Sequence, residues 1–181
     1  GDRVGGTWWD NTYPGAACDI PSNLYSFSFA PNPNWSRSYS ESAEILDYIE
    51  YLVSAFGLKK HIRFNHNVTG LDFDEGRGLW TAQLADGGSV RARSAVMAQG
   101  PLSNASFPDI EGVADFRGKK IHSARWDHDY DFSGKRVGVI GTGASGIQIV
   151  PELVERVDAL KVFQRTPAWV IPRPDYATPD W

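Results

Sequence analysis

The feature that most constrains this chain is a glycine pattern placed between two segments of regular structure. Gly141, Gly143 and Gly146 follow the spacing G-x-G-x-x-G. The apolar run over 136–140 predicts a buried strand directly before them, and the residues after them predict a helix. A second strand is expected over 160–164, so this part of the chain is predicted to form a parallel βαβ unit.

A turn of this composition suits a phosphate group. The first glycine permits the tight turn, the second lets the backbone approach a pyrophosphate, and the third lets the helix pack closely on the strand. Free N–H groups at the start of the helix then face the anion. We predict that a dinucleotide is bound by Gly141, Thr142, Gly143, Ala144, Ser145, Gly146 and Gln148. The alternative is a glycine-rich turn without a ligand, and the flanking strand and helix argue against it.

The end of the second strand indicates which dinucleotide is bound. A site for NAD usually carries an acidic residue about 20 residues beyond the glycines, where it bonds the ribose 2′-hydroxyl. This chain has Gln164, Arg165 and Thr166 there instead. A guanidinium can hold phosphate oxygens through two parallel hydrogen bonds. We therefore predict NADP(H) rather than NAD(H), with Arg165 and Thr166 among the binding residues; the alternative is an exposed surface arginine.

Upstream of the βαβ unit, apolar periodicity predicts one helix and a small sheet. Residues 42–56 have apolar side chains at helical spacing, with Ser42 as the N-cap and Gly57 as the stop. Strands are predicted over 62–64, 68–73, 79–85 and 89–92, with a turn at 86–88, and a short buried strand over 95–98. Polar residues and breakers over 101–132 predict a connector, and a second unit begins near Ser133.

The opening 40 residues are rich in turn formers and aromatic residues. The run from Gly5 to Asp10, GGTWWD, suits a loop against a flat polar ligand, because glycine leaves room, threonine donates a hydrogen bond and indole offers a ring face. Asp19 lies among small and apolar residues and needs a partner if buried; a capping aspartate fits equally well. Burial is expected for Trp8, Trp9, Tyr13, Leu24, Tyr25, Phe27 and Phe29.

The net charge and the cysteine content limit which binding partners and which cellular compartment the sequence predicts for the protein. The net charge of −4 gives no positive field for nucleic acid or acidic lipid, so we predict neither a nucleic-acid partner nor a membrane. Apolar runs stay well below the roughly 20 residues of a membrane helix. The single cysteine, Cys18, cannot form an internal disulfide, which favours the cytoplasm. No metal site is predicted.

Two longer patterns extend the argument beyond the glycine turn. The connector contains FRGKKIHSARWD, from Phe116 to Asp127, which has the spacing F-x-G-x-x-x-H-x-x-x-W followed by Asp. The run from Gly5 to Asp19 has the spacing G-G-x-W, four residues, aromatic-Pro-Gly, three residues and Asp. With the glycine turn and the run 162–167, these patterns lie in the order found in Baeyer–Villiger flavoprotein monooxygenases. The chain resembles that family over nearly its whole length.

The resemblance implies roles for residues outside the glycine turn. In the family, FAD is contacted at positions that correspond to Thr7, Trp8, Trp9, Asp10, Asp19, Tyr25 and Val68. Asp19 also corresponds to the active-site acid, which holds a catalytic arginine near the flavin. His122 corresponds to a residue that couples domain movement to NADP placement, although a lone connector histidine is more often structural. The fingerprint is completed by Phe116, Gly118, Trp126 and Asp127.

The resemblance also sets the expected fold and activity. The fold is α/β: a partial, mixed FAD-binding domain with a β-hairpin over 1–100, the connector over 101–132, and the start of a Rossmann-like NADP-binding domain over 133–181. The implied reaction uses FAD, NADPH and O2 to insert oxygen next to the carbonyl of a small-molecule ketone, giving an ester or lactone. The alternatives are a flavin-containing oxygenase of amine nitrogen or thioether sulfur, which the Trp126-Asp127 ending disfavours, and a non-catalytic nucleotide-binding fragment.

Two departures from the family concern what the chain contains. Family members carry a separate G-x-G-x-x-G for the FAD pyrophosphate and an arginine that pairs with the active-site acid, and this sequence has neither at the corresponding place. We therefore expect the chain to be an internal piece of a longer protein that neither retains FAD tightly nor turns over alone.

Overall fold

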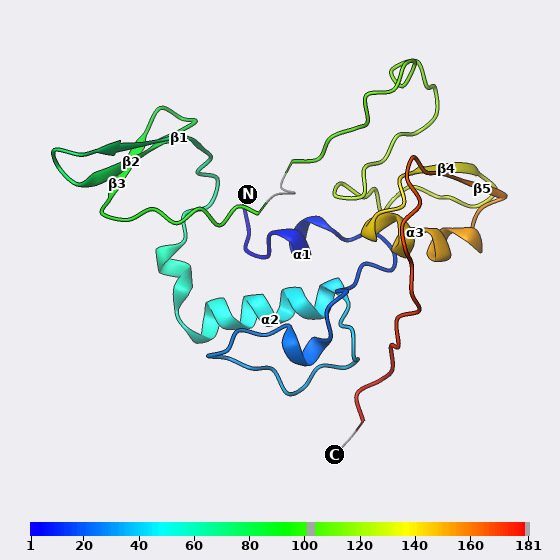
Figure 1. Ribbon diagram of the computed structural model, residues 1–181, viewed down its shortest axis with the longest axis horizontal. Coiled ribbons are helices and arrows are strands. Elements are labelled where there is room, and N and C mark those ends of the chain that lie inside the picture. Colours follow the sequence, from blue (N-terminus) through cyan, green and yellow to red (C-terminus); the bar gives the residue numbers. More distant parts are fainter. Residues whose placement is uncertain (101–103, 180–181) are drawn as a thin grey trace.

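The computed structural model describes residues 1–100 and 104–179 (Figure 1). Short helices and one long helix make up the first part, namely α1 (Thr7–Asp10), the 3-10 turn η1 (Ser22–Leu24), α2 (Ser42–Ala55) and the 3-10 turn η2 (Leu58–His61). A small antiparallel sheet follows, and the last elements form a βαβ unit; residues 104–135 before that unit form neither helix nor strand and are called the irregular segment. The order of elements is the α/β arrangement that the sequence predicts.

The helix α2 supplies most of the core of the first part. Ile45, Tyr48 and Leu52 lie on one face because they are three and four residues apart. They are buried together with Cys18 and Trp35, which the irregular chain before α2 brings to that face. The loops of the opening residues are therefore ordered by packing on this helix.

The two ends of α2 differ in how well the sequence predicts them. Glu41 occupies the N-cap position and Ser42 is the first helical residue, so the predicted Ser42 cap is wrong by one residue. Gly57 has a φ of 61°, the left-handed conformation that glycine adopts easily, and it ends the helix as predicted.

Among the helices of the described residues, none has both the length and the apolar character needed to cross a membrane.

The sheet consists of three antiparallel strands in the order β1-β2-β3, with β1 at Val68–Asp74, β2 at Leu79–Leu84 and β3 at Ser89–Ala92. Gly87, with a φ of 85°, forms the tight turn between β2 and β3. The Asp86 carboxylate accepts a hydrogen bond from the Gly88 N–H at 2.9 Å and fixes that turn. The predicted hairpin and the strand before it are confirmed to within one residue. Figure 1 places this sheet at one end of the molecule, away from α3.

The βαβ unit consists of β4 (Arg136–Ile140), α3 (Ala144–Val154) and β5 (Ala159–Phe163). The two strands are parallel, with Val137 opposite Leu160 and Val139 opposite Val162. Both strands and the helix lie where the sequence predicts them, and the helix ends at Val154. The glycine pattern therefore lies between a strand and a helix, and in that context G-x-G-x-x-G indicates a dinucleotide-binding turn.

Two predicted strands do not form in the part of the chain that the structure describes. Residues 62–64 lie between η2 and a turn in which Asn65 has a φ of 57°, so too few residues remain for a ladder. Residues 95–98 pair with no strand of the described chain, and the side chains of Val96 and Met97 are 88% and 64% exposed. An apolar strand is buried only where other elements cover both of its faces, and the sequence pattern alone does not report such cover.

Part of the expected aromatic core is also exposed. Tyr13 is buried, and Tyr25 and the two tryptophans of α1 are half-buried. More than half of the surface of Leu24, Phe27 and Phe29 is exposed, so the prediction that these side chains are buried is wrong. Phe27 and Phe29 stack on each other with ring centroids 5.3 Å apart, which covers one ring face without a core.

A second cluster joins the opening loop to the βαβ unit. Tyr13 and Ala16 are buried against Ile149 and Leu153 of α3. Trp126, from the irregular segment, packs against the same cluster. Residues more than 130 positions apart in the sequence thus share one apolar core, and α3 lies beside the opening loop (Figure 1).

Candidate nucleotide-binding site

The glycine turn connects β4 to α3 at the carboxyl edge of the two parallel strands. Gly141 has a φ of 107°, which side chains rarely permit. A Cβ atom on Gly146 would lie 2.5 Å from the carbonyl oxygen of Gly141, so only glycine lets the helix start this close to the turn. A Cβ atom on Gly143 would meet nothing within 4 Å. The fold itself requires the outer two glycines, whereas Gly143 borders open space.

The start of α3 offers hydrogen-bond donors to that space. The helix has 11 residues and its N-cap is Gly143, whose carbonyl oxygen accepts the N–H of Ile147 at 3.1 Å. In the described part of the chain, the N–H groups of Ala144, Ser145 and Gly146 donate to no backbone oxygen, as is usual in a first helical turn. Three free donors at the positive end of the helix dipole favour an anion such as a pyrophosphate.

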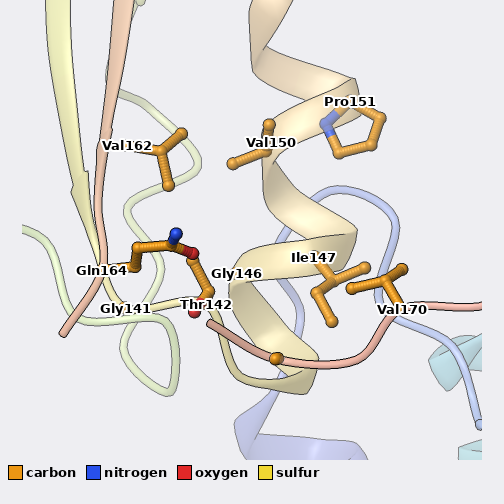
Figure 2. A pocket seen from close by; sticks show the side chains of 10 residues that line it. Gly141, Thr142, Gly146, Ile147, Val150, Pro151, Val162, Gln164 and Val170 are labelled. Atoms are coloured by element: carbon orange, nitrogen blue, oxygen red, sulfur yellow. The ribbon is translucent and has the colours of Figure 1, made fainter. Parts of the chain in front are cut away.

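A cavity of about 260 Å³ opens beside the turn (Figure 2). Gly141, Thr142 and Gly146 form its floor, and its walls are largely apolar. In Figure 2, Val150 of α3 and Val162 of β5 lie on opposite sides of the cavity. Its volume lies just below the range of about 300–1,000 Å³ that is usual for small-molecule pockets, so it suits one half of a dinucleotide.

The residues predicted to select NADP(H) follow the end of β5. Gln164 lines the cavity, and Arg165 and Thr166 come directly after it with exposed side chains. Within the described residues Arg165 makes no ion pair, so its guanidinium is available to a phosphate. Arg165 is not part of the cavity lining itself. Its contact with a 2′-phosphate stays a prediction.

The two opening glycines have different roles in the structure. A Cβ atom on Gly5 would collide with the Cδ1 atom of Leu46, so Gly5 lets α1 pack on α2. A Cβ atom on Gly6 would meet nothing within 4 Å, although its φ of 51° already favours glycine. Only Gly6 therefore leaves space beside α1 for a ligand.

The α1 turn consists of four of the seven residues predicted to contact FAD, and the Trp8 side chain is held by Tyr25. The Trp8 indole N–H donates to the Tyr25 hydroxyl at 3.1 Å, and the rings meet edge to face with centroids 5.6 Å apart. Burial raises the pKa of Tyr25 above its ordinary value, despite the hydrogen bond from Trp8 that lowers it. Trp9 lies under the Arg3 guanidinium at 4.6 Å, and the Thr7 side chain is exposed.

Val68, another residue predicted to contact FAD, lies at the start of β1 with half of its surface exposed. Three residues before it, the N–H of Asn65 donates to the carbonyl oxygen of Gly1 at 2.7 Å. This bond connects the start of the sheet with the beginning of the opening loop. The structure thus brings Trp8 together with Tyr25, and the Asn65–Gly1 hydrogen bond connects the backbone before Val68 to the opening loop.

The irregular segment contacts the opening loop through two polar pairs. Arg125 forms an ion pair with Asp10 at 3.2 Å, and the Thr12 hydroxyl lies 2.8 Å from Nε2 of His128. Both partners in the segment belong to, or directly follow, the fingerprint of residues 116–127. The fingerprint therefore lies against the loop that carries α1.

Four fingerprint residues have structural contacts of their own. A Cβ atom on Gly118 would lie 2.5 Å from the ring of Phe116, so glycine lets that ring fold over the chain. Trp126 packs on the cluster beneath α3. The Asp127 carboxylate pairs with Lys119, and the hydrogen bond from Lys119 lowers the pKa of Asp127 below its ordinary value.

The His122 side chain stabilises a local turn. Its Nδ1 atom accepts the N–H of Ala124 at 3.1 Å, so the proton lies on Nε2 when the ring is neutral. The His122 ring meets Phe107 edge to face, with centroids 5.8 Å apart. These contacts shape the connector, and a coupling of His122 to NADP placement stays a prediction.

Gln148 is the direct polar connection between α3 and the opening loop. Its Oε1 atom accepts the Tyr13 hydroxyl at 2.9 Å and the Ala17 N–H at 3.4 Å, and its Nε2 atom donates to the Ala17 carbonyl oxygen at 2.9 Å. A Cβ atom on Gly15 would lie 2.8 Å from the Gln148 carbonyl oxygen, so the loop approaches the helix backbone closely. Both polar atoms of the Gln148 side-chain amide are therefore hydrogen-bonded to the opening loop. The contact with the cofactor that the sequence predicts for Gln148 stays a prediction.

Asp19, the predicted active-site acid, is exposed and lies two residues after Ala17. In the described part of the chain it forms no ion pair. Its neighbour Cys18 is buried, and burial raises the pKa of that thiol. Arg173 donates from Nη1 to the Cys18 carbonyl oxygen at 3.4 Å. Sequence reasoning missed Arg173, because 155 residues separate it from Cys18 and no local pattern marks it.

The chain is similar in sequence to known flavoproteins. A family model described as flavin-binding monooxygenase-like matches residues 12–178. A Baeyer-Villiger monooxygenase of Streptomyces coelicolor is 54% identical over 174 residues, which is 96% of this chain and 33% of that protein. A Baeyer-Villiger monooxygenase of Pseudomonas aeruginosa is 47% identical over the same shares of both chains.

The fold is similar to solved structures of the same kind. A steroid monooxygenase bound to NADP has a TM-score of 0.90 and 46% identity, over 98% of this chain and 35% of that chain. A cyclohexanone monooxygenase with bound epsilon-caprolactone has a TM-score of 0.90 and 39% identity over the same shares. The chain belongs to the flavin-binding monooxygenase-like family. It spans about a third of the length of the curated relatives it matches.

Proposed function

We propose that the protein is a flavin-dependent monooxygenase that uses NADPH and O2 to convert a small-molecule ketone into an ester or lactone. The observation that carries the proposal is the glycine turn, which lines a cavity with its helix donors free. Relatives named Baeyer-Villiger monooxygenase at 54% and 47% identity support this reaction class. The fingerprint from Phe116 to Asp127 supports it independently.

For the nucleotide, each part of the site has a separate task. The N–H groups of Ala144, Ser145 and Gly146 bind the pyrophosphate, and Gly143 leaves room for it. The apolar walls around Val150 and Val162 exclude water from the bound half of the nucleotide. The solved steroid monooxygenase binds NADP, which supports the choice of this nucleotide. Arg165 accounts for the preference for a 2′-phosphate.

For the flavin, the residues of α1 fit a flat polar ligand. Trp8 and Trp9 are half-buried and fixed by Tyr25 and Arg3, and Gly6 leaves open space beside them. The flavin, when bound, supplies the redox and oxygen chemistry. These residues orient the cofactor and keep water from one side of it. A solved relative with a TM-score of 0.90 and 40% identity was determined with FAD and NADP.

Asp19 is proposed to act by orienting a cation beside the flavin. An exposed carboxylate, with no ion pair among the described residues, can hold such a cation at the surface of the opening loop.

We also place the protein in the cytoplasm, since its single cysteine is a free, buried thiol.

Product analysis tests the proposed reaction. The whole protein is supplied with NADPH, O2 and either a cyclic ketone or a thioether, and the products are measured by mass spectrometry. A lactone from the ketone, with NADPH consumed in equal amount, supports the proposal. A sulfoxide with no lactone would show the other oxygenase class, and protein without flavin absorbance would show a non-catalytic nucleotide binder.

A further inference from the structure

One wall of the nucleotide cavity is formed by a segment with little burial of its own. Residues 166–172, here called the strap, follow shortly after β5 and pass the start of α3 (Figure 2). Ala168 and Val170 line the cavity, and Figure 2 shows Val170 beside Ile147. Trp169 and Ile171, which alternate with these residues in the sequence, are fully and 83% exposed. So small a buried surface cannot by itself hold the strap against the cavity.

Beyond the strap, residues 173–178 attach to loop 36–39 next to α2, as the red end of the chain shows in Figure 1. The N–H of Ser38 donates to the Tyr176 carbonyl oxygen at 2.9 Å, and the N–H of Thr178 donates to the Ser36 carbonyl oxygen at 2.9 Å. The Tyr176 N–H donates to the Ser38 hydroxyl at 2.9 Å. The strap is thus fixed at both ends, by β5 and by this attachment, which we call the latch.

The Asp175 carboxylate is the centre of the latch. Its Oδ2 atom accepts from Nε of Arg37 at 3.0 Å and pairs with Nη2 at 2.9 Å. Its Oδ1 atom accepts from the Ser38 hydroxyl at 3.1 Å and from the Tyr39 N–H at 3.3 Å. The side chain is only 15% exposed. Both Arg37 contacts meet the same oxygen, and the two donors on Oδ1 satisfy the other, so both oxygens of the charged carboxylate are hydrogen-bonded.

Other contacts extend the latch toward the opening loop. The Arg173 guanidinium lies 5.5 Å from the centre of the Tyr39 ring, 3.9 Å from Asp175 and 3.4 Å from the Cys18 carbonyl oxygen. Burial by itself raises the pKa of Asp175, but the hydrogen bonds from Arg37 and Ser38 outweigh it and hold the pKa below its ordinary value. Asp175 is therefore a charged carboxylate at neutral pH.

We propose that Asp175 is a positioning residue for the nucleotide: by fastening residues 173–178 to loop 36–39, it keeps the strap closed over the cavity. The inference rests on the proposed binding of NADP(H) there. Asp175 touches no residue of the glycine turn, so it acts through Ala168 and Val170. If the latch is broken and the strap is closed only a tenth of the time, the apparent Kd rises about tenfold.

The test compares Asp175→Asn with the unsubstituted whole protein. Three quantities are measured: the Kd for NADP+ by calorimetry, the hydrogen exchange of residues 166–172, and the KM and kcat for NADPH. We expect a Kd and a KM about tenfold higher, faster exchange of the strap, and a kcat changed less than twofold. An unlatched strap with an unchanged Kd, or a raised Kd with an unchanged strap, would overturn the inference.

Two further variants keep the test decisive. Asp74→Asn removes an exposed carboxylate that pairs with Arg77 at the distant turn between β1 and β2, and it should change none of the three quantities. If Asp175→Asn fails to fold, Ser38→Ala removes one donor to Asp175 and leaves the Arg37 pair, with an expected two- to threefold rise in Kd. An unsubstituted protein that does not bind NADP+ refutes the proposed function, whereas normal binding by the latch variants refutes only the latch.

Discussion

Alanine substitutions at two glycines of the same turn should have different consequences. A Cβ atom on Gly146 would lie 2.5 Å from the Gly141 carbonyl oxygen, where ordinary contacts begin at 3.4 Å, so the turn and the helix must separate by about 0.9 Å. Overpacking of this kind costs about 1–3 kcal/mol. Gly146→Ala should therefore lower the Tm by roughly 2–12 °C for a folding unit of about 150–250 residues, and weaken NADP+ binding as the turn moves.

Gly143→Ala should spare the fold and lose the ligand. Gly143 has a φ of −73°, which alanine adopts, and its Cβ atom would meet nothing within 4 Å. The stability change should stay within about 1 kcal/mol, the scale of N-cap effects. The new methyl group would occupy the space in front of the free N–H donors. Loss of one charge-assisted hydrogen bond, worth about 1.5–3 kcal/mol, weakens NADP+ binding about 10- to 100-fold.

Thermal unfolding and NADP+ titration, on both variants and on Gly76→Ala, separate these effects. Gly76 lies in the turn between β1 and β2, where a Cβ atom would meet only an Asp74 carboxylate oxygen at 3.4 Å, so this control should change neither quantity. Gly143→Ala with full NADP+ affinity would refute the reasoning, because a pyrophosphate held by the first turn of α3 cannot share that space with a methyl group.

Four further outcomes are expected. Arg165→Ala should reduce the preference for NADPH over NADH, measured as the ratio of kcat/KM values, at least tenfold; an unchanged ratio would remove Arg165 from the site. Gln148→Met leaves the polar groups of the opening loop unpaired and should cost about 2–4 kcal/mol in urea unfolding, while a loss below about 0.5 kcal/mol would contradict the structural role. Asp19→Ala should depress oxygenation far more than FAD binding, and equal losses would argue against its role. Because folding lowers the pKa of Asp175, its contacts contribute stability that is present above its unfolded pKa of about 4 and is lost as the pH falls through the lower folded pKa. Strap protection factors, corrected for the intrinsic pH dependence of exchange, should fall once Asp175 is protonated, and unchanged protection there would contradict the latch.

Elements with strong local signals are the ones that the sequence predicts well. The helix α2, the hairpin turn at Asp86 to Gly88, and the βαβ unit all follow from periodicity and glycine placement. The outer glycines of the turn are required for the reasons expected, since Gly141 has a positive φ and Gly146 packs on it. The placement of these elements needs no information from distant residues.

The failures concern burial and long-range contact. The apolar run over 95–98 predicts a buried strand, but burial depends on elements elsewhere, and Val96 is exposed. Phe27 and Phe29 likewise cover each other instead of filling a core. Asp175 and Arg37 are 138 residues apart, and neither stands in a motif, so the latch has no local signature. For Gln148 the sequence suggests a ligand contact, whereas the structure adds hydrogen bonds to the opening loop.

A crystal structure of the whole protein with bound NADP+ tests the central claim most directly. We predict that the pyrophosphate oxygens lie within about 3.2 Å of the N–H groups of Ala144 to Gly146, with the 2′-phosphate at Arg165 and the strap closed beside it. A nucleotide bound elsewhere, with the start of α3 facing only water, would contradict the account of this site.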